Sequence, residues 1–130
     1  MTKKTNQQKI SALKRKADVL IQKVYKQKWP KSLISGQPTE TIHHYVQKSQ
    51  CERLRYDPIN LIPLTNAEHC RHHTSGDPRI VEEIVMTKGL DWVKEIQKIR
   101  GQSGKRLNQG TLNQIIADLE EMVKEYGGGE

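Results

Sequence analysis

The sequence contains no phenylalanine, only two cysteines, and no apolar run that approaches the ~20 residues of a membrane-spanning helix. Its mean hydropathy is −0.80, so the core of this 130-residue chain must depend on isoleucine, leucine and valine. Cys51 and Cys70 form no C-x-x-C pair, which argues against a disulfide framework and for a reducing environment. No signal-peptide pattern opens the chain. We therefore expect a cytoplasmic protein with no membrane partner.

Positive charge is concentrated near the N-terminus. Residues 1–31 hold ten lysines and arginines against the single acid Asp18, whereas the rest of the chain is slightly negative. Such a segment predicts a polyanionic partner such as DNA, and Lys14 and Arg15 are among the residues expected to contact it. The alternative is a solvated helix face that only aids solubility, and the charge alone does not decide between the two.

Hydrophobic periodicity predicts an α+β fold that is mostly helical, with one short strand-containing insert. Apolar residues at helical spacing predict a first helix over 6–28, which Trp29-Pro30 ends because the residue before proline disfavours helix. Asp77 and Pro78 predict a later helix start, and Gly89 predicts its end. The remaining elements are predicted as strands at 41–46 and 61–64 and helices at 66–73, 78–88 and 90–100.

The C-terminal part is predicted to be a separate helix after a flexible linker. The segment 101–110 is rich in glycine and polar residues, and Thr111 and Gln114 have the spacing of a capping box. The amphipathic helix over 111–126 has an apolar stripe that would be buried in the core or in a symmetric homodimer.

All five histidines fall in the predicted strand–loop–strand–helix insert. His69 and His73 are four residues apart, so on a helix their rings share a face and can hold one metal ion. His43, on the first strand, can supply a third ligand, and three protein ligands leave positions open, as in catalytic metal sites. His44 points away from His43 and would be free as a general base, with a pKa near its working value.

The line THHY…RLRYDPINLIPL…EHCRHHTSG resembles the HNH (ββα-metal) endonuclease motif over about residues 32–76. The family has a His-His or Asp-His pair on the first strand, an Asn in the loop and His-x-x-x-His on the helix. Here these are His43-His44, Asn60, and His69 with His73. The flanking residues are similar to phage-borne HNH proteins, including recombination nucleases of the lambda NinG/Rap type. The resemblance implies a nuclease domain over residues 1–100, with the ββα-metal motif inserted between the N-terminal helix and the C-terminal helices.

The resemblance also implies a function, namely metal-dependent hydrolysis of DNA phosphodiester bonds in phage DNA recombination or processing, in the cytoplasm of a bacterial host. One divalent ion (Mg, Mn, Ni or Zn) would be held by His43, His69 and His73. His44 would deprotonate the attacking water, and Asn60 would hold the loop or the base, or ligate the metal. Three arginines are expected to grip phosphate through paired donors, namely Arg53, Arg55 and Arg71.

One departure from the family concerns a structural zinc that many HNH proteins hold with two C-x-x-C pairs. The corresponding positions here are Ser32, Ser35, Thr65 and Glu68, so we expect no structural zinc, and the N-terminal and C-terminal helices must supply the missing stability. Two alternatives stay open. One is a noncatalytic DNA-binding module in which zinc is bound by Cys51, His69, Cys70 and His73. The other is an HNH scaffold that has lost catalysis.

Overall fold

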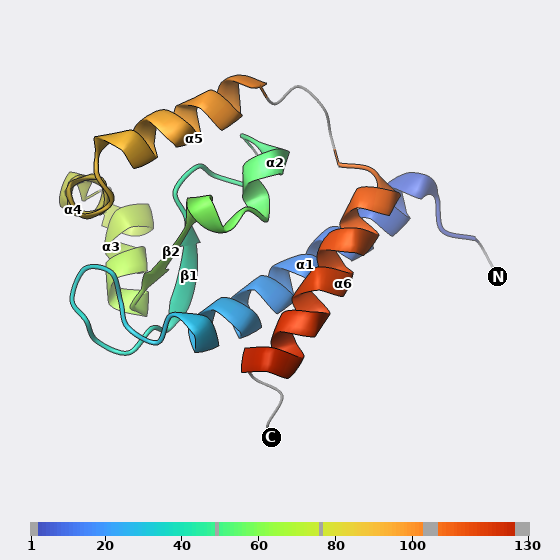
Figure 1. Ribbon diagram of the computed structural model, residues 1–130, viewed down its shortest axis with the longest axis horizontal. Helices are drawn as coiled ribbons and strands as arrows, with labels where there is room; N and C mark the ends of the chain where they lie inside the picture. The colour runs from blue at the N-terminus through green and yellow to red at the C-terminus, as the bar shows by residue number, and fades with distance from the viewer. Residues whose placement is uncertain (1–2, 49, 76, 103–106, 127–130) are drawn as a thin grey trace.

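The computed structural model describes residues 3–48, 50–75, 77–102 and 107–126, without the side chains of residues 72–75. It confirms a mostly helical α+β fold with a small two-stranded antiparallel sheet (Figure 1). The elements in chain order are α1 (Asn6–Lys28), β1 (Thr41–His44), α2 (Glu52–Arg55), the 3-10 helix η1 (Pro58–Asn60), β2 (Leu61–Leu64), α3 (Asn66–Ser75), α4 (Pro78–Lys88), α5 (Leu90–Gln102) and α6 (Gln109–Tyr126). Of the helices described, none has both the length and the apolar character needed to cross a membrane.

Helix α1 has the bounds that its periodicity predicts, and its start is fixed by a capping box. The Thr5 hydroxyl accepts a hydrogen bond from the Gln8 backbone at 3.1 Å, and the Gln8 side chain accepts one from the Thr5 backbone at 2.8 Å. Both interactions satisfy backbone groups that the first helical turn leaves without intrahelical partners. The helix ends before Trp29-Pro30, as predicted.

The two strands pair antiparallel, with His43 opposite Ile62 and His44 opposite Leu61. Strand β2 has its predicted bounds, whereas β1 ends at His44 instead of residue 46. The connection between the strands folds into α2 and η1, which the sequence analysis did not predict. Elements of four and three residues are too short to show a hydrophobic period.

The core surrounds the sheet in three clusters of buried side chains. Ile42 and Leu61 pack with the apolar faces of α1 and α6, whereas Ile62 and Leu64 pack with Ile80 and Ile84 of α4. A third cluster joins the strand connection to α5 and consists of Val46, Cys51, Leu54, Ile96 and Ile99. The sheet therefore lies between α1 on one side and α4 on the other.

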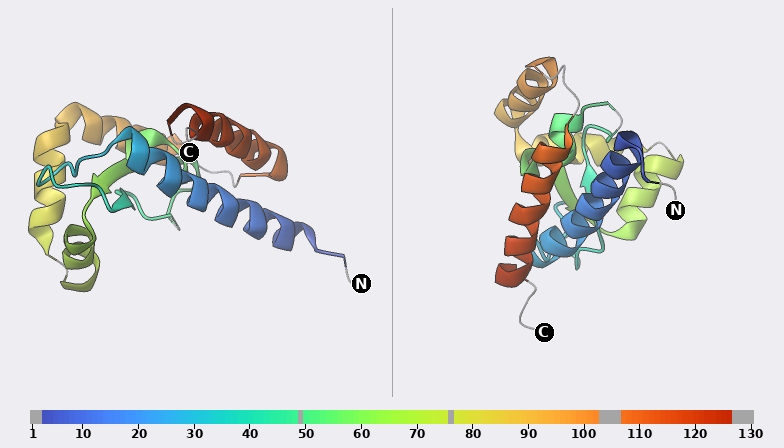
Figure 2. Two further views of the ribbon diagram at one scale, coloured as in Figure 1. Left: turned by 90° about the horizontal axis from the view of Figure 1, so that it is seen from below. Right: turned by 90° about the vertical axis from the view of Figure 1, so that its right-hand side faces the viewer.

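Helix α6 packs lengthwise against α1, as the views in Figures 1 and 2 show. Its stripe residues Leu112, Ile116 and Leu119 are at most 5% exposed and belong to the same cluster as Ala17 and Ile21 of α1. The stripe is thus core, which was one of the two predicted uses. A homodimer through this helix stays a prediction, and it would have to use the less buried part of the stripe, such as Tyr126 at 37% exposed.

The predicted linker and capping box are corrected by the structure. Helix α5 continues to Gln102 and α6 begins at Gln109, so Thr111 lies inside the helix. The cap is Asn108, whose side-chain oxygen accepts a hydrogen bond from the Thr111 backbone at 2.8 Å. The Leu107 backbone donates to the Glu52 carboxylate at 2.7 Å, which ties the start of α6 to α2. The linker residues 103–106 lie outside the described part of the chain.

Candidate active site

Three of the five histidines meet at a pocket of about 410 Å³ beside β1. Strand β1 contacts both α1 and α3, and the pocket is lined by Gln22 of α1, Thr41–His44 of β1, Gln47 and Lys48 after β1, and His69 of α3. The Gln22 side chain pairs with both backbone groups of Ile42, at 2.9 Å each. This pairing satisfies the backbone along the edge of β1 that faces away from β2 and fixes α1 against the pocket.

Two of the three predicted metal ligands lie together in this pocket. The ring centroids of His43 and His69 are 5.2 Å apart in an edge-on arrangement, and the Nδ1 atoms of both rings are buried. His73 follows His69 by one helical turn, but its side chain is outside the described residues. Among the described side chains, no group of three or more His, Cys, Asp or Glu residues is placed to hold an ion. Two imidazoles from β1 and α3 fit part of a site for a borderline-soft ion such as Zn or Ni.

His44 is held by one hydrogen bond that determines which ring nitrogen carries the proton. Its Nε2 is 2.8 Å from the backbone carbonyl oxygen of Arg55. A carbonyl can only accept, so Nε2 carries the hydrogen and Nδ1 is left as the acceptor. Burial lowers the pKa of His44 to about 4, against the opposing effect of the Arg55 hydrogen bond. The pKa is therefore below the predicted working value, and the ring is neutral at pH 7.

Arg55 positions His44 and is itself fixed by Asp18 of α1. Its Nη2 and Nε donate to the two carboxylate oxygens of Asp18 at 2.6 and 3.2 Å, and its side chain is 18% exposed. Two of its five N–H donors are thus used within the chain, and a grip of Arg55 on phosphate stays a prediction. The Lys14 ammonium likewise pairs with the Glu52 carboxylate, and its contact with DNA stays a prediction.

Asn60 is fully buried and holds the connection between the strands. Its Oδ1 accepts from the Val46 backbone at 2.7 Å, while its Nδ2 donates to the carbonyls of Val46 at 3.0 Å and Leu54 at 3.2 Å. Of the roles predicted for Asn60, these contacts support holding the loop. Both ends of its amide are used, so the geometry does not favour metal ligation.

The four positions at which the resemblance would place zinc ligands converge into a hydrogen-bond network, the Ser32–Glu68 network (Ser32, Ser35, Thr65 and Glu68). The Ser32 hydroxyl donates to the buried Glu68 carboxylate at 2.6 Å, which also accepts from the Thr65 backbone at 2.8 Å. Burial alone would raise the pKa of Glu68, but hydrogen bonds from Ser32, Thr65 and Ser35 outweigh it and lower the pKa below the ordinary 4.5. The network joins the segment before β1 to the start of α3.

Replacing Glu68 by glutamine should remove a pH-dependent part of the stability. A carboxyl whose pKa is lower in the folded chain stabilises it above the unfolded pKa and loses this effect as pH falls through the folded pKa. We expect Glu68→Gln to cost about 1.5–3 kcal/mol at pH 7, the value of hydrogen bonds to charged groups. The difference from wild type should shrink below about pH 4.5. Urea unfolding of both proteins across this pH range measures the difference in unfolding free energy. A difference that does not change with pH would contradict the role given to the Glu68 carboxylate.

The two cysteines lie in different surroundings. Cys51 is 3% exposed and packs with Val46, Leu54 and residues of α5, whereas Cys70 is exposed on α3. A zinc site that uses both cysteines would require Cys51 to leave its apolar cluster. The structure therefore disfavours the alternative of a noncatalytic zinc module.

The remaining predicted residues are surface residues, and several pocket residues were not predicted. Arg53 and Arg15 are exposed, and Arg71 is half exposed with its Nε 3.5 Å from Asp77. Sequence analysis missed Gln22 and Lys48, because single polar residues on a helix and in a loop carry no motif. Comparisons of the chain with protein-family models, with curated proteins and with solved structures found no significant match.

Proposed function

We propose that this protein is a metal-dependent endonuclease of the HNH type that hydrolyses DNA phosphodiester bonds. The observation that carries the proposal is the convergence of His43 and His44 from β1 with His69 from α3 on one pocket. The strand–strand–helix order of β1, β2 and α3 agrees with the order of the motif that the sequence resembles. The flanking similarity to phage HNH proteins favours a role in phage DNA recombination or processing.

Each histidine then has a separate role. His43, His69 and His73 would hold one divalent ion. When bound, such an ion stabilises the negative charge that develops on the leaving oxygen and lowers the pKa of water. His44, whose proton is on Nε2, accepts the proton of the attacking water at Nδ1.

The charges around the pocket suit an anionic substrate. Lys48 lines the pocket, and none of the described lining residues is acidic. The nearest carboxylate partner of Lys48 is Asp18, at 3.8 Å, and Asp18 also pairs with Arg55. Two cations thus offset the single acid, so a phosphate that enters meets a net positive field.

Removing the metal ion tests the proposal and should separate activity from folding. We expect EDTA to stop nicking of supercoiled DNA while the far-UV circular dichroism stays helical, because the core clusters and the Ser32–Glu68 network need no ion. Loss of a bound ion lowers stability by mass action, about 2.7 kcal/mol at a hundredfold excess over its dissociation constant. The melting temperature should therefore fall by several degrees only.

The same assay distinguishes the alternatives. Added Mg, Mn, Ni or Zn should restore nicking to the chelated protein. A protein that never nicks DNA with any of these ions would favour the inactive scaffold. A protein that unfolds at 25 °C in EDTA would favour a structural zinc site instead.

A further inference from the structure

One face of α1 runs from the histidine pocket to the N-terminal end of the helix and carries no core side chains. Steps of three, four or seven residues place its members on the same side of the helix. We name this face the α1 stripe, which consists of Gln8, Ser11, Arg15, Val19 and Gln22 of the helix together with Lys4, which precedes the helix and lines the same groove as Gln8. Gln22 lines the histidine pocket, and Val19 is 67% exposed.

Two other sides of α1 contact the chain itself, while Lys9, Lys16 and Lys23 lie on a further exposed side. Ala17 and Ile21 are buried in the core, and Lys14 pairs with Glu52 of α2. Lys16 lies 3.8 Å from Glu120 of α6. The α1 stripe is the open face that joins the histidine pocket to the groove at the N-terminal end of the helix.

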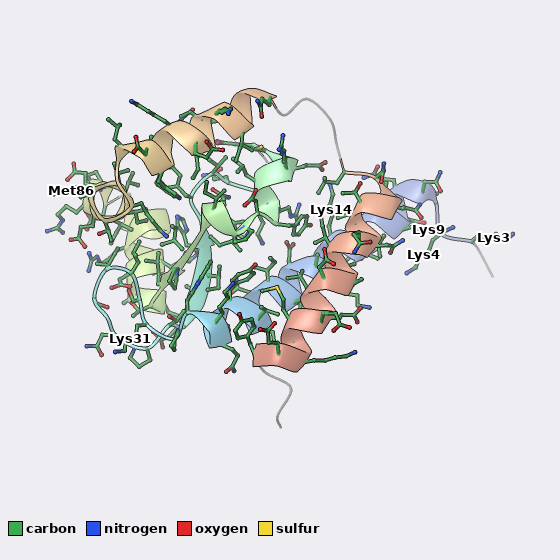
Figure 3. All side chains as sticks on the ribbon, viewed as in Figure 1. Lys3, Lys4, Lys9, Lys14, Lys31 and Met86 are labelled. Carbon is green, nitrogen blue, oxygen red and sulfur yellow. The ribbon has the colours of Figure 1, made fainter. Side chains whose placement is uncertain are left out.

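The N-terminal end of the stripe forms a second hollow. A groove of about 310 Å³ is lined by Lys4, Gln7, Gln8, Ser11 and Arg15, all of which have donors and none of which is acidic. Figure 2 shows this end of α1 extending away from the sheet, and Figure 3 shows Lys3, Lys4 and Lys9 gathered there. Arginine, lysine, serine and glutamine are the side chains that bind nucleic-acid phosphates.

The acid nearest to the stripe does not repel a polyanion. Asp18 lies one residue before Val19, but its carboxylate is held by Arg55 at 2.6 Å and is 3.8 Å from Lys48. The net charge that a partner meets along the stripe is therefore positive. Lys4 and Arg15 supply it at one end, and Lys48 lies at the other. A face of net positive charge that joins two hollows suits an extended anion and not a compact one.

We propose that the α1 stripe binds one flank of the DNA substrate, so that the protein needs duplex on one particular side of the cleaved bond. This inference rests on the proposed function. Gln8 and Gln22 are fourteen helical steps apart, or about 21 Å at 1.5 Å per residue. Duplex DNA rises about 3.4 Å per base pair, so the stripe spans about six base pairs.

Two neighbouring residues give a matched test by binding. Arg15→Ala and Lys16→Ala each remove one exposed positive charge from α1, but only Arg15 is on the stripe, since Lys16 faces α6. Binding is measured by fluorescence anisotropy of a labelled duplex in EDTA, so that cleavage plays no part. Arg15→Ala should weaken binding about tenfold and reduce the log–log salt slope by about 0.9. Lys16→Ala should change the affinity and the salt slope much less. Equal effects of the two variants would overturn the proposal.

Substrate length gives the second test, with metal present. The duplex is shortened stepwise on one side of the cut, from about ten base pairs to two. Cleavage should stop once that flank is shorter than about six base pairs. Shortening the other flank should have a smaller effect, and equal losses on both sides would exclude a one-sided contact. If no DNA is cut but Arg15→Ala still weakens binding more than Lys16→Ala does, DNA binding by the α1 stripe is supported and the proposed nuclease function is not.

Discussion

Replacing His44 by alanine is expected to lower DNA cleavage by about 10²- to 10⁴-fold, the contribution of a general base. The bond from Nε2 to the Arg55 carbonyl leaves Nδ1 as the atom that takes the proton of water. The measurement is the initial rate of nicking at saturating metal ion, with metal affinity measured by calorimetry. Because His44 is not a proposed ligand, His44→Ala should bind the ion as wild type does, whereas His73→Ala should lose both affinity and activity.

Two controls separate the loss of the base from damage to the pocket. Gln47 lines the same pocket but cannot take a proton at neutral pH, so Gln47→Ala should keep cleavage within severalfold. Added imidazole should restore part of the rate to His44→Ala, since the pocket of about 410 Å³ has room for the lost ring. Wild-type rates in His44→Ala, or metal loss as severe as in His73→Ala, would show that the two roles are wrongly assigned.

Replacing Asn60 by alanine is expected to destabilise the fold by about 3–5 kcal/mol, because several buried polar groups lose their partner together. The amide of Val46 and the carbonyls of Val46 and Leu54 all bind the Asn60 side chain. Small domains are stable by only about 5–15 kcal/mol, so a large share of the stability is at risk. Asn60→Asp should be at least as damaging, since it points a carboxylate oxygen at two carbonyl oxygens. Urea unfolding monitored by circular dichroism measures both variants.

Asn113→Ala is the matched control for Asn60→Ala. Asn113 is exposed on α6, so the same change should alter stability by less than about 0.5 kcal/mol. Cleavage by Asn60→Ala should fall in proportion to the unfolded fraction. A variant that is as stable as wild type but inactive would instead mean that Asn60 acts directly on the substrate or the ion.

Elements with a local signal could be predicted from the sequence. Helix α1 and strand β2 have their predicted bounds, and α4 starts at Asp77-Pro78 and ends at Gly89 as predicted. In each case the determinant is a hydrophobic period or a capping residue within a few positions. The elements α2 and η1 are too short to show a period, although Asp57 caps η1 locally, and Asn60 of η1 binds the Leu54 carbonyl of α2.

The candidate site was predictable as a set of residues but not as a set of contacts. The spacing of His43, His44 and His69 predicted one site, and the structure places all three at one pocket. The partners of Arg55 and Lys14 were not predictable, because Asp18 and Glu52 are far from them in sequence and any surface acid could have served. The low pKa of His44 likewise depends on burial, which only the fold determines.

The packing of α1 against α6 joins two helices that are far apart in the sequence. During synthesis α1 leaves the ribosome before α6, and half of the buried side chains that cover α1 arrive only with Leu112, Ile116 and Leu119. Contacts between such distant segments form late, because a long loop must close before they gain any stability. Gln22 and Asp18, which fix α1 against β1 and Arg55, are on this same helix. Completion of the histidine pocket is therefore coupled to the synthesis of α6, so a nascent chain carries its histidines well before it can assemble the pocket.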